Sequence, residues 1–304
     1  LYEHKSPQKD RISHVLTQIS GGGLLQKGTQ FIEGVHYELD EDLGEGGFGI
    51  VKSVKLLEPG KKLLCPNGEN NIELAAKIAN IDDDEIQILK LLVDCPNIAQ
   101  HYFIVDSNKE VWKKNYKKKK KELKQFKHIM FMKRAEMSLE EYKNGLNDRV
   151  LPLEEAVTFF RQIVVAEAYV QSLHIFHNDI KPSNVLVFCN GDKQKTANLC
   201  DFEFAERCGF PRARTGGTKY YEPPEGQFKT SSSKDIYALG LLFLEITIAR
   251  ASVPPERSKW HEFKEELVKE LKRKNTQLGA LIKECLEQTV NDIDYLREKL
   301  DEIG

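Results

Sequence analysis

The strongest chemical pattern in the sequence lies at residues 177–184, which read His-Asn-Asp-Ile-Lys-Pro-Ser-Asn after a long apolar helical pattern. It places an acid (Asp179), a cation (Lys181) and an amide (Asn184) on one irregular segment. Such an acid can orient an attacking hydroxyl, the lysine can neutralise charge on a transferring phosphate, and the amide oxygen can bind Mg²⁺. The pattern therefore predicts phosphoryl transfer.

A second acid follows an apolar strand pattern, where Leu-Cys-Asp-Phe ends in Asp201 and Phe202. A carboxylate in this place is suited to Mg²⁺ that bridges the β- and γ-phosphates of a nucleotide. We therefore expect Asn184 and Asp201 to hold Mg²⁺, and ATP to be the phosphate donor.

Residues 44–51 fit the pattern G-x-G-x-x-G-x-V, with glycines at Gly44, Gly46 and Gly49. Without side chains, the backbone N–H groups of such a turn can approach phosphates closely. The dinucleotide-binding version of the motif needs a helix directly after the glycines. A strand pattern follows here, so the sequence excludes that alternative.

A lysine, Lys77, lies within the apolar strand pattern 72–78, and Glu85 opens the amphipathic helix pattern 82–92. A buried lysine is costly unless an anion meets it, so the two residues are candidates for holding the α- and β-phosphates. Two plainer interpretations stay open: Lys77 as an edge-strand lysine that reaches solvent, and Glu85 as a solvent-facing acid.

Periodicity divides the chain into a β-rich first third and a helical remainder. Strands are predicted at 37–44 and 50–56, which form a hairpin, and at 72–78, 99–105 and 128–132. Helices are predicted at 82–92, 139–142, 153–173, 235–248 and within 257–301. We expect an α+β fold of two lobes, with an N-terminal extension at 1–34, a small β-rich lobe at 35–134 and a larger helical lobe at 135–304.

The composition favours a globular protein of 304 residues, with 40% apolar and 30% charged residues and a formal charge of −2. No apolar run approaches the ~20 residues that span a bilayer, and residues 1–34 lack a signal-peptide pattern. The six cysteines have no metal-binding spacing, which predicts free thiols in the cytoplasm, with the nucleus as an alternative.

These motifs resemble those of the eukaryotic protein kinase family over residues 35–304. The resemblance implies that Asp179 is the catalytic base, with Lys181, Lys77 and Glu85 beside it in the catalytic machinery. Lysine two residues after the base, and Thr218 in a G-T-x-x-Y pattern, resemble serine/threonine kinases. A protein substrate is therefore expected.

The same resemblance implies an adenine slot beside the three glycines that cover the phosphates. Met132 matches the family's gatekeeper, and Phe131 is the alternative one residue away. Cys200 would face the slot. The slot's other members are Leu43, Val51, Ala75, Leu186 and the hinge backbone from Lys133 to Ala135.

The sequence departs from the family pattern where Asn178 replaces the arginine that reads an activation-loop phosphate, so we expect activity without loop phosphorylation. Glu203 replaces a glycine, and Glu225 lacks an obvious arginine partner in 281–300, where Arg297 is a poor positional match. These departures support an alternative, a pseudokinase scaffold that binds nucleotide and partners with little transfer. The short segment 201–225 is similar to the MAP kinase kinase kinase group and its NF-κB-inducing kinase type.

Nine lysines fall among fifteen residues in a block that begins at Lys113 and ends at Lys127. A solvated insertion between two strands is the plainer interpretation. The alternatives are an anionic partner, nucleic acid or acidic lipid, and a nuclear address. The sequence makes no prediction of oligomeric state.

Overall fold

The computed structural model describes residues 36–46, 49–57, 73–93, 95–106, 126–189, 194–209, 216–224, 231–249 and 259–303. They belong to two compact units. The first unit holds the described residues as far as Ile86 together with Gln100–Arg134, and the second holds Gln87–Ala99 and the described residues from Ala135 onwards. The predicted extension at residues 1–34 lies outside the described residues.

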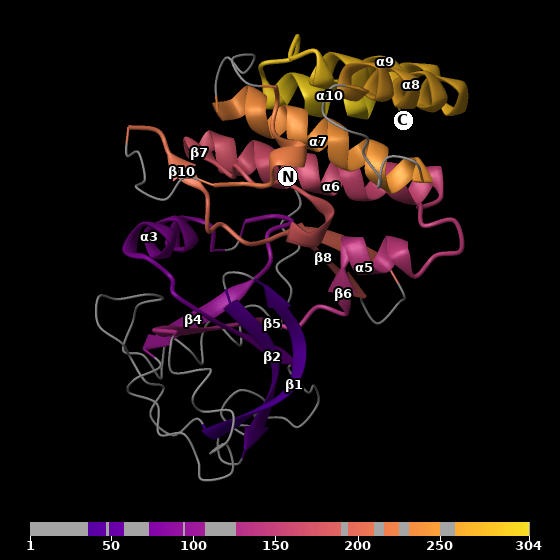
Figure 1. Cartoon of the computed structure of the whole chain (residues 1–304). Helices are drawn as coiled ribbons and strands as arrows, with labels where there is room; N and C mark the ends of the chain where they lie inside the picture. The colour runs from indigo at the N-terminus through magenta and orange to yellow at the C-terminus, as the bar shows by residue number, and fades with distance from the viewer. Residues whose placement is uncertain are drawn as a thin grey trace. The chain divides into compact units, whose positions relative to one another are not determined.

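The first unit is built on an antiparallel sheet in the order β1-β2-β3-β5-β4 (Figure 1). The strands are β1 (His36–Gly46), β2 (Gly49–Leu57), β3 (Leu74–Ala79), β4 (His101–Asp106) and β5 (His128–Lys133). The helix α3 (Asp83–Leu91) begins in this unit, with Asp83, Asp84 and Glu85 in its first turn. Acidic residues there complement the positive end of the helix dipole.

The two faces of this sheet carry different residues because side chains alternate along a strand. One face is an apolar core made of Leu39, Ala76, Ile78, Ile129 and Phe131. Ala75 pairs with Met132, and Lys77 pairs with Val51 on one side and Met130 on the other. These paired residues therefore lie on the opposite face from the core.

The second unit is mainly helical, and two apolar helices lie side by side in it, α6 and α7 (Figure 1). Their contact includes Phe160 and Phe243, whose ring centroids are 4.7 Å apart. The helices are α5 (Leu139–Asn144), α6 (Leu153–Ser172), α7 (Ser231–Thr247), α8 (Trp260–Lys274), α9 (Thr276–Leu286) and α10 (Ile293–Ile303). None of the helices in the described part of the chain is long and apolar enough to cross a membrane.

Short strands and 3-10 turns of the second unit carry the candidate site. One sheet has the order β6-β8-β9, and a separate pair joins β10 to β7. The elements are β6 (Met137–Ser138), β7 (Ile175–Phe176), η2 (Pro182–Asn184), β8 (Val185–Cys189), β9 (Lys195–Leu199), β10 (Glu206–Arg207) and η3 (Lys219–Tyr221).

The predicted α+β class is confirmed, with a β-sheet in one unit and helices in the other. Most predicted elements differ from the observed ones by one or two residues. The helix α7 is an exception, since it begins at Ser231, four residues before the predicted start at 235. Its first turn is polar, so apolar periodicity alone could not find it.

Gly49 and Gly44 offer a matched test of how closely the strands of the first unit approach. A Cβ on Gly49 would lie 2.6 Å from the carbonyl oxygen of Ile78, whereas a Cβ on Gly44 would meet nothing within 4 Å. We expect Gly49→Ala to force β2 from β3 and lower the free energy of unfolding by about 1–3 kcal/mol. Gly44→Ala should stay within about 0.5 kcal/mol of the parent. Urea unfolding measures both, and equal losses would contradict the packing described.

Candidate active site

The segment that bears the predicted acid is held by one buried carboxylate of α7. The two oxygens of Asp235 accept hydrogen bonds from the backbone N–H groups of His177 and Asn178, both at 2.8 Å. Asp235 and His177 are fully buried. Asn178 has φ 63°, a conformation that asparagine adopts more readily than most residues. The chain therefore turns sharply at Asn178 and delivers Asp179 from a fixed backbone.

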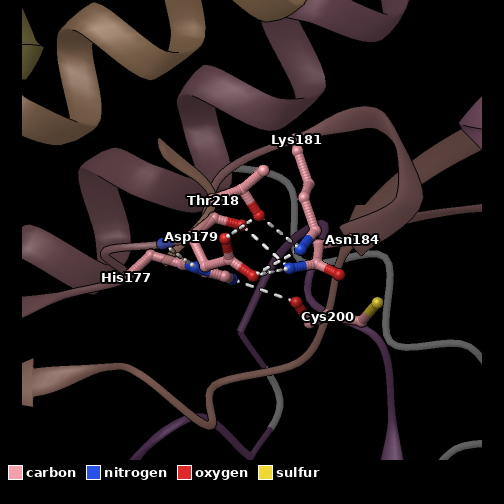
Figure 2. Close-up of polar contacts among 6 residues, drawn as sticks. All are labelled: His177, Asp179, Lys181, Asn184, Cys200 and Thr218. Carbon is pink, nitrogen blue, oxygen red and sulfur yellow. Dashed lines mark hydrogen bonds and ion pairs between the residues drawn. The ribbon is translucent and has the colours of Figure 1, made fainter. Parts of the chain in front are cut away.

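Asp179 lies at the centre of a hydrogen-bond network (Figure 2). The Thr218 hydroxyl donates to its Oδ1 at 2.8 Å, and Lys181 Nζ donates to its Oδ2 at 2.7 Å. Lys181 also donates to Thr218 Oγ1 at 2.8 Å, which closes a triangle of acid, cation and hydroxyl. The side chain of Asn184 donates to Oδ2 and to the backbone carbonyl of Asp179, at 2.9 and 2.8 Å. The structure therefore brings together the acid, cation and amide of 177–184, and adds Thr218.

The segment that contains Asp201 is bonded directly to this loop. The Cys200 N–H donates to the carbonyl of Asn184 at 2.9 Å, and His177 Nε2 lies 3.0 Å from the carbonyl of Cys200 (Figure 2). The ring of His177 also packs on Phe202, with centroids 4.7 Å apart. Asp201 itself has φ 65°. These contacts hold Asn184 and Asp201 in one connected part of the second unit.

Asn184 and Asp201 have the chemistry that a magnesium site needs. The amide nitrogen of Asn184 is used by Asp179, and its side-chain oxygen points away from that residue (Figure 2). An amide oxygen and a carboxylate are hard oxygen ligands, and Mg²⁺ commonly takes one or two of these and completes its shell with water and phosphate oxygens. The two side chains therefore fit Mg²⁺ that is shared with a nucleotide.

The structure accommodates two departures from the family pattern, Glu203 and Asn178. Glu203 is buried, and its φ is not positive. Its position therefore does not require glycine. The side chain of Asn178 makes a hydrogen bond of its own, since its Nδ2 donates to the carbonyl of Phe204 at 3.2 Å. Asn178 thereby ties the segment after Asp201 to the loop that bears Asp179.

The first unit contains the glycine motif and the predicted lysine. Gly44 and Gly46 lie on β1 and Gly49 on β2, with Gly46 opposite Gly49. The strand that carries Lys77 has β2 on one side and β5 on the other, so the edge-strand interpretation of Lys77 is wrong. Glu85 is 2% exposed, so the solvent-facing interpretation of that acid is wrong as well.

The other predicted nucleotide residues divide between the units. Leu43, Val51, Ala75, Met132 and Lys133 belong to the first unit, whereas Ala135, Leu186 and Cys200 belong to the second. The pleat of β5 separates the two gatekeeper candidates, since Phe131 packs in the apolar core and Met132 lies on the face with Ala75 and Lys77.

A brace that the sequence did not reveal anchors the described segment 216–224. Tyr221 donates a hydrogen bond from its hydroxyl to Glu245 of α7, and Lys143 of α5 forms an ion pair with the same carboxylate at 3.2 Å. Burial, followed by the charge of Glu245, raises the pKa of Tyr221. Glu225 lies outside the described residues, and Arg297 pairs with Asp294 of its own helix at 3.0 Å.

Comparison with known proteins agrees with this geometry. The model of the protein kinase domain family matches residues 37–292, most of the chain. The chain belongs to the protein kinase family. That match includes the glycine motif, Lys77, the loop of Asp179 and the segment of Asp201.

Several curated serine/threonine and mitogen-activated kinases are similar to this chain. A SNF-related serine/threonine-protein kinase of Rattus norvegicus is 28% identical over 68% of the chain and 25% of its own length. Mitogen-activated protein kinase 15 of Oryza sativa subsp. japonica is 27% identical over 74% of the chain and 43% of its length. A carbon catabolite-derepressing protein kinase of Candida albicans is 26% identical over 70% of the chain and 32% of its length. The chain thus spans less than half of the length of each of these relatives.

Thr218 gives a direct test of the network around Asp179. Thr218→Ala removes a hydroxyl that contacts both Asp179 and Lys181, and loss of a hydrogen bond to a charged group costs about 1.5–3 kcal/mol. We expect phosphate transfer to fall by roughly 10- to 100-fold. Thr218→Ser keeps the hydroxyl and should retain most of the rate. An alanine variant that folds and is as active as the parent would contradict the network's role.

Proposed function

We propose that this chain is an ATP-dependent protein serine/threonine kinase that transfers the γ-phosphate to protein hydroxyls. The observation that carries the proposal is the buried Asp179 carboxylate, held in one orientation by Thr218, Lys181 and Asn184. A carboxylate in this state can accept a hydrogen bond from an incoming hydroxyl, and the adjacent Lys181 cation can offset charge on the phosphate that moves.

Nucleotide binding is assigned to residues of both units, according to whether their side chains suit Mg²⁺ or phosphate. Asn184 and Asp201 would bind Mg²⁺, which neutralises phosphate charge when it is present. Lys77, with Glu85, would bind the α- and β-phosphates, and the backbone of the glycine motif (Gly44, Gly46 and Gly49) would cover them.

Adenine binding is assigned to apolar residues and to the hinge. Met132 is the better gatekeeper candidate, because it shares a strand face with Ala75 and Lys77. The Lys133 N–H already donates to the carbonyl of Gln100 at 3.0 Å, so Lys133 would offer its carbonyl to the base. The apolar walls would be Leu43, Val51, Ala75, Leu186 and Cys200.

A pseudokinase scaffold is the second candidate, and Asn178 and Glu203 are the observations that favour it. Both replace residues that active kinases of the family commonly carry, and a buried carboxylate at Glu203 adds negative charge close to Asp201 in the chain. Asn178 nevertheless keeps the loop attached to Phe204, and the backbone at Glu203 is unstrained. These facts favour transfer over the scaffold.

The kinase subgroup, the partner of the lysine block and the cellular compartment are proposed from the sequence alone. The short segment 201–225, the non-arginine loop of Asp179 and the Leu-Cys-Asp-Phe motif are similar to the MAP kinase kinase kinase group and its NF-κB-inducing kinase type, and this placement stays a prediction. Residues 113–125 lie outside the described residues, so the anionic partner of the lysine block stays a prediction. The cytoplasm, with the nucleus as the alternative, also stays a prediction, in agreement with the free cysteines of the described chain.

Substitution of the metal-binding and phosphate-binding residues tests the proposed activity. We expect Lys77→Met and Asp201→Asn to lower phosphate transfer at least about a hundredfold, because each removes a charge that meets phosphate or Mg²⁺. The matched controls Lys299→Met and Asp294→Asn change exposed residues of α10 and should leave the rate unchanged. Equal inactivity of the parent and both site variants, with ATP still bound, would establish the scaffold.

Independence from loop phosphorylation needs variants chosen with the structure in view. Thr218 and Tyr221 are unsuitable, because their hydroxyls already bond Asp179 and Glu245. We expect phosphatase-treated protein, Thr215→Ala and Tyr220→Phe all to retain the parent rate, since Asn178 ties the segment to the loop without a phosphate. Loss of activity in Thr215→Ala that Thr215→Glu restores would contradict this expectation.

A further inference from the structure

One carboxyl group of the second unit is buried in α6 and has no role in the reaction described above. Glu167 is 0% exposed and lies in the otherwise apolar stretch of α6 that packs against α7. Its Oε1 accepts a hydrogen bond from Gln171 Nε2 at 2.8 Å, and Gln171 Oε1 in turn accepts from the Ser232 hydroxyl of α7 at 2.6 Å. The carboxyl group is thus oriented by a chain of neutral polar groups.

The second oxygen of Glu167 lies in the α6 segment that packs on α7, the helix whose Asp235 holds the loop that bears Asp179. Oε2 is buried, and no donor among the described residues reaches it. Among the described charged side chains, Asp235 is the one whose charge acts on the Glu167 carboxyl, and it accepts hydrogen bonds from the His177 and Asn178 N–H groups. Two carboxylates cannot hydrogen-bond each other, and a buried like-charge pair is costly. A proton shared by Glu167 and Asp235 would remove this cost.

Of the two groups, Glu167 is the better candidate to carry that proton. Burial raises the pKa of the Glu167 carboxyl well above its usual range, and the charge of Asp235 raises it further. Burial also raises the pKa of Asp235, but the His177 side chain, followed by the backbone N–H donors of Asn178 and His177, opposes that rise. Asp235 is the titratable group that faces Glu167 from α7, and His177 is the titratable residue of the loop beside Asp235.

We propose that Glu167 is a positioning residue for phosphate transfer: as a neutral carboxylic acid it donates a hydrogen bond from Oε2 to Asp235 and so orients the carboxylate that fixes the loop of Asp179. The proposal rests on the proposed kinase activity for its kinetic consequence. It adds to that activity a hydrogen-bonded path from Ser232 through Gln171, Glu167 and Asp235 to the backbone of the catalytic loop.

Two substitutions separate the hydrogen bond from the mere filling of space. Glu167→Gln keeps a neutral donor of nearly the same shape, and it should keep kcat close to that of the parent. Glu167→Leu fills similar volume but donates nothing, and it should lower kcat by roughly 10- to 100-fold, the equivalent of one hydrogen bond to a charged acceptor. KM for ATP should change little in either variant, because Glu167 does not touch the nucleotide residues.

Two further readouts do not depend on activity. The unfolded chain releases the Glu167 proton above about 4.5, its ordinary pKa, whereas the folded chain keeps it, so stability falls as pH rises from there towards the folded pKa. Glu167→Gln should lose less stability over this pH range, because it has no such proton. The melting temperature of the variant relative to that of the parent should therefore increase as pH rises. The parent should also show an infrared carbonyl band of a protonated carboxyl group that is missing in Glu167→Gln.

Failure of the positioning role and failure of the kinase activity give different results in these experiments. Loss of kcat in Glu167→Gln equal to that in Glu167→Leu, or parallel pH–stability curves for the parent and Glu167→Gln, or no infrared difference, would overturn the proposal while the kinase activity stands. Absence of transfer in the parent would overturn the proposed function, and with it the positioning role. In that case the pH–stability curves and the infrared band would still report whether Glu167 holds the proton.

Discussion

The candidate site depends on one interaction, in which the carboxylate of Asp235 accepts hydrogen bonds from two backbone N–H groups. Burying a carboxylate is costly, and good hydrogen bonds are what make it tolerable in a protein interior. Here those bonds run to His177 and Asn178, so the helix α7 is paired with the turn that presents Asp179. The positive φ of Asn178 is maintained by the same bonds. The bond from the Asn178 side chain to Phe204 and the contact of His177 with Cys200 then support the same turn.

Several other contacts then follow in sequence from this anchored turn. Asp179 meets Lys181, Asn184 and Thr218, and the backbone of Asn184 receives the Cys200 N–H next to Asp201. Each group is both oriented by its neighbours and used to orient the next. Networks of this kind can be worth more than the sum of their pairs. For the proposed phosphate transfer, their value would be that the acid and the candidate metal-binding side chains need little rearrangement when nucleotide and substrate arrive.

Many of the structural elements and candidate site residues could be predicted from the sequence, where the pattern lies within a short segment. The glycine motif, the apolar strand around Lys77 and the spacing of Asp179, Lys181 and Asn184 all lie within short segments, and the structure places the last three together. The polar start of α7 gives no such pattern, because apolar periodicity begins only at Ile236. Glu85 was ambiguous because its burial depends on the fold around α3 rather than on neighbouring residues.

The contacts that sequence reasoning missed join residues far apart in the chain. Thr218 and Asp179 are 39 positions apart, and Tyr221 and Glu245 are 24 apart. No local pattern records such a pairing. A weak signal did exist for Glu167, since a single acid between Ala166 and Ala168 in an apolar helix is unusual without a buried partner. The proposed partner, Asp235, lies on α7, so it could be named only from the packing of α6 on α7.

Native-state hydrogen exchange of the His177 and Asn178 amides, read residue by residue, tests the central claim most directly. If Asp235 holds the catalytic loop as described, both amides should exchange as slowly as the interior amides of α7, because exchange would require the helix and loop to separate. Exchange at the rate of an exposed loop, while α7 remains protected, would show that the loop is not held by Asp235 and would contradict the account.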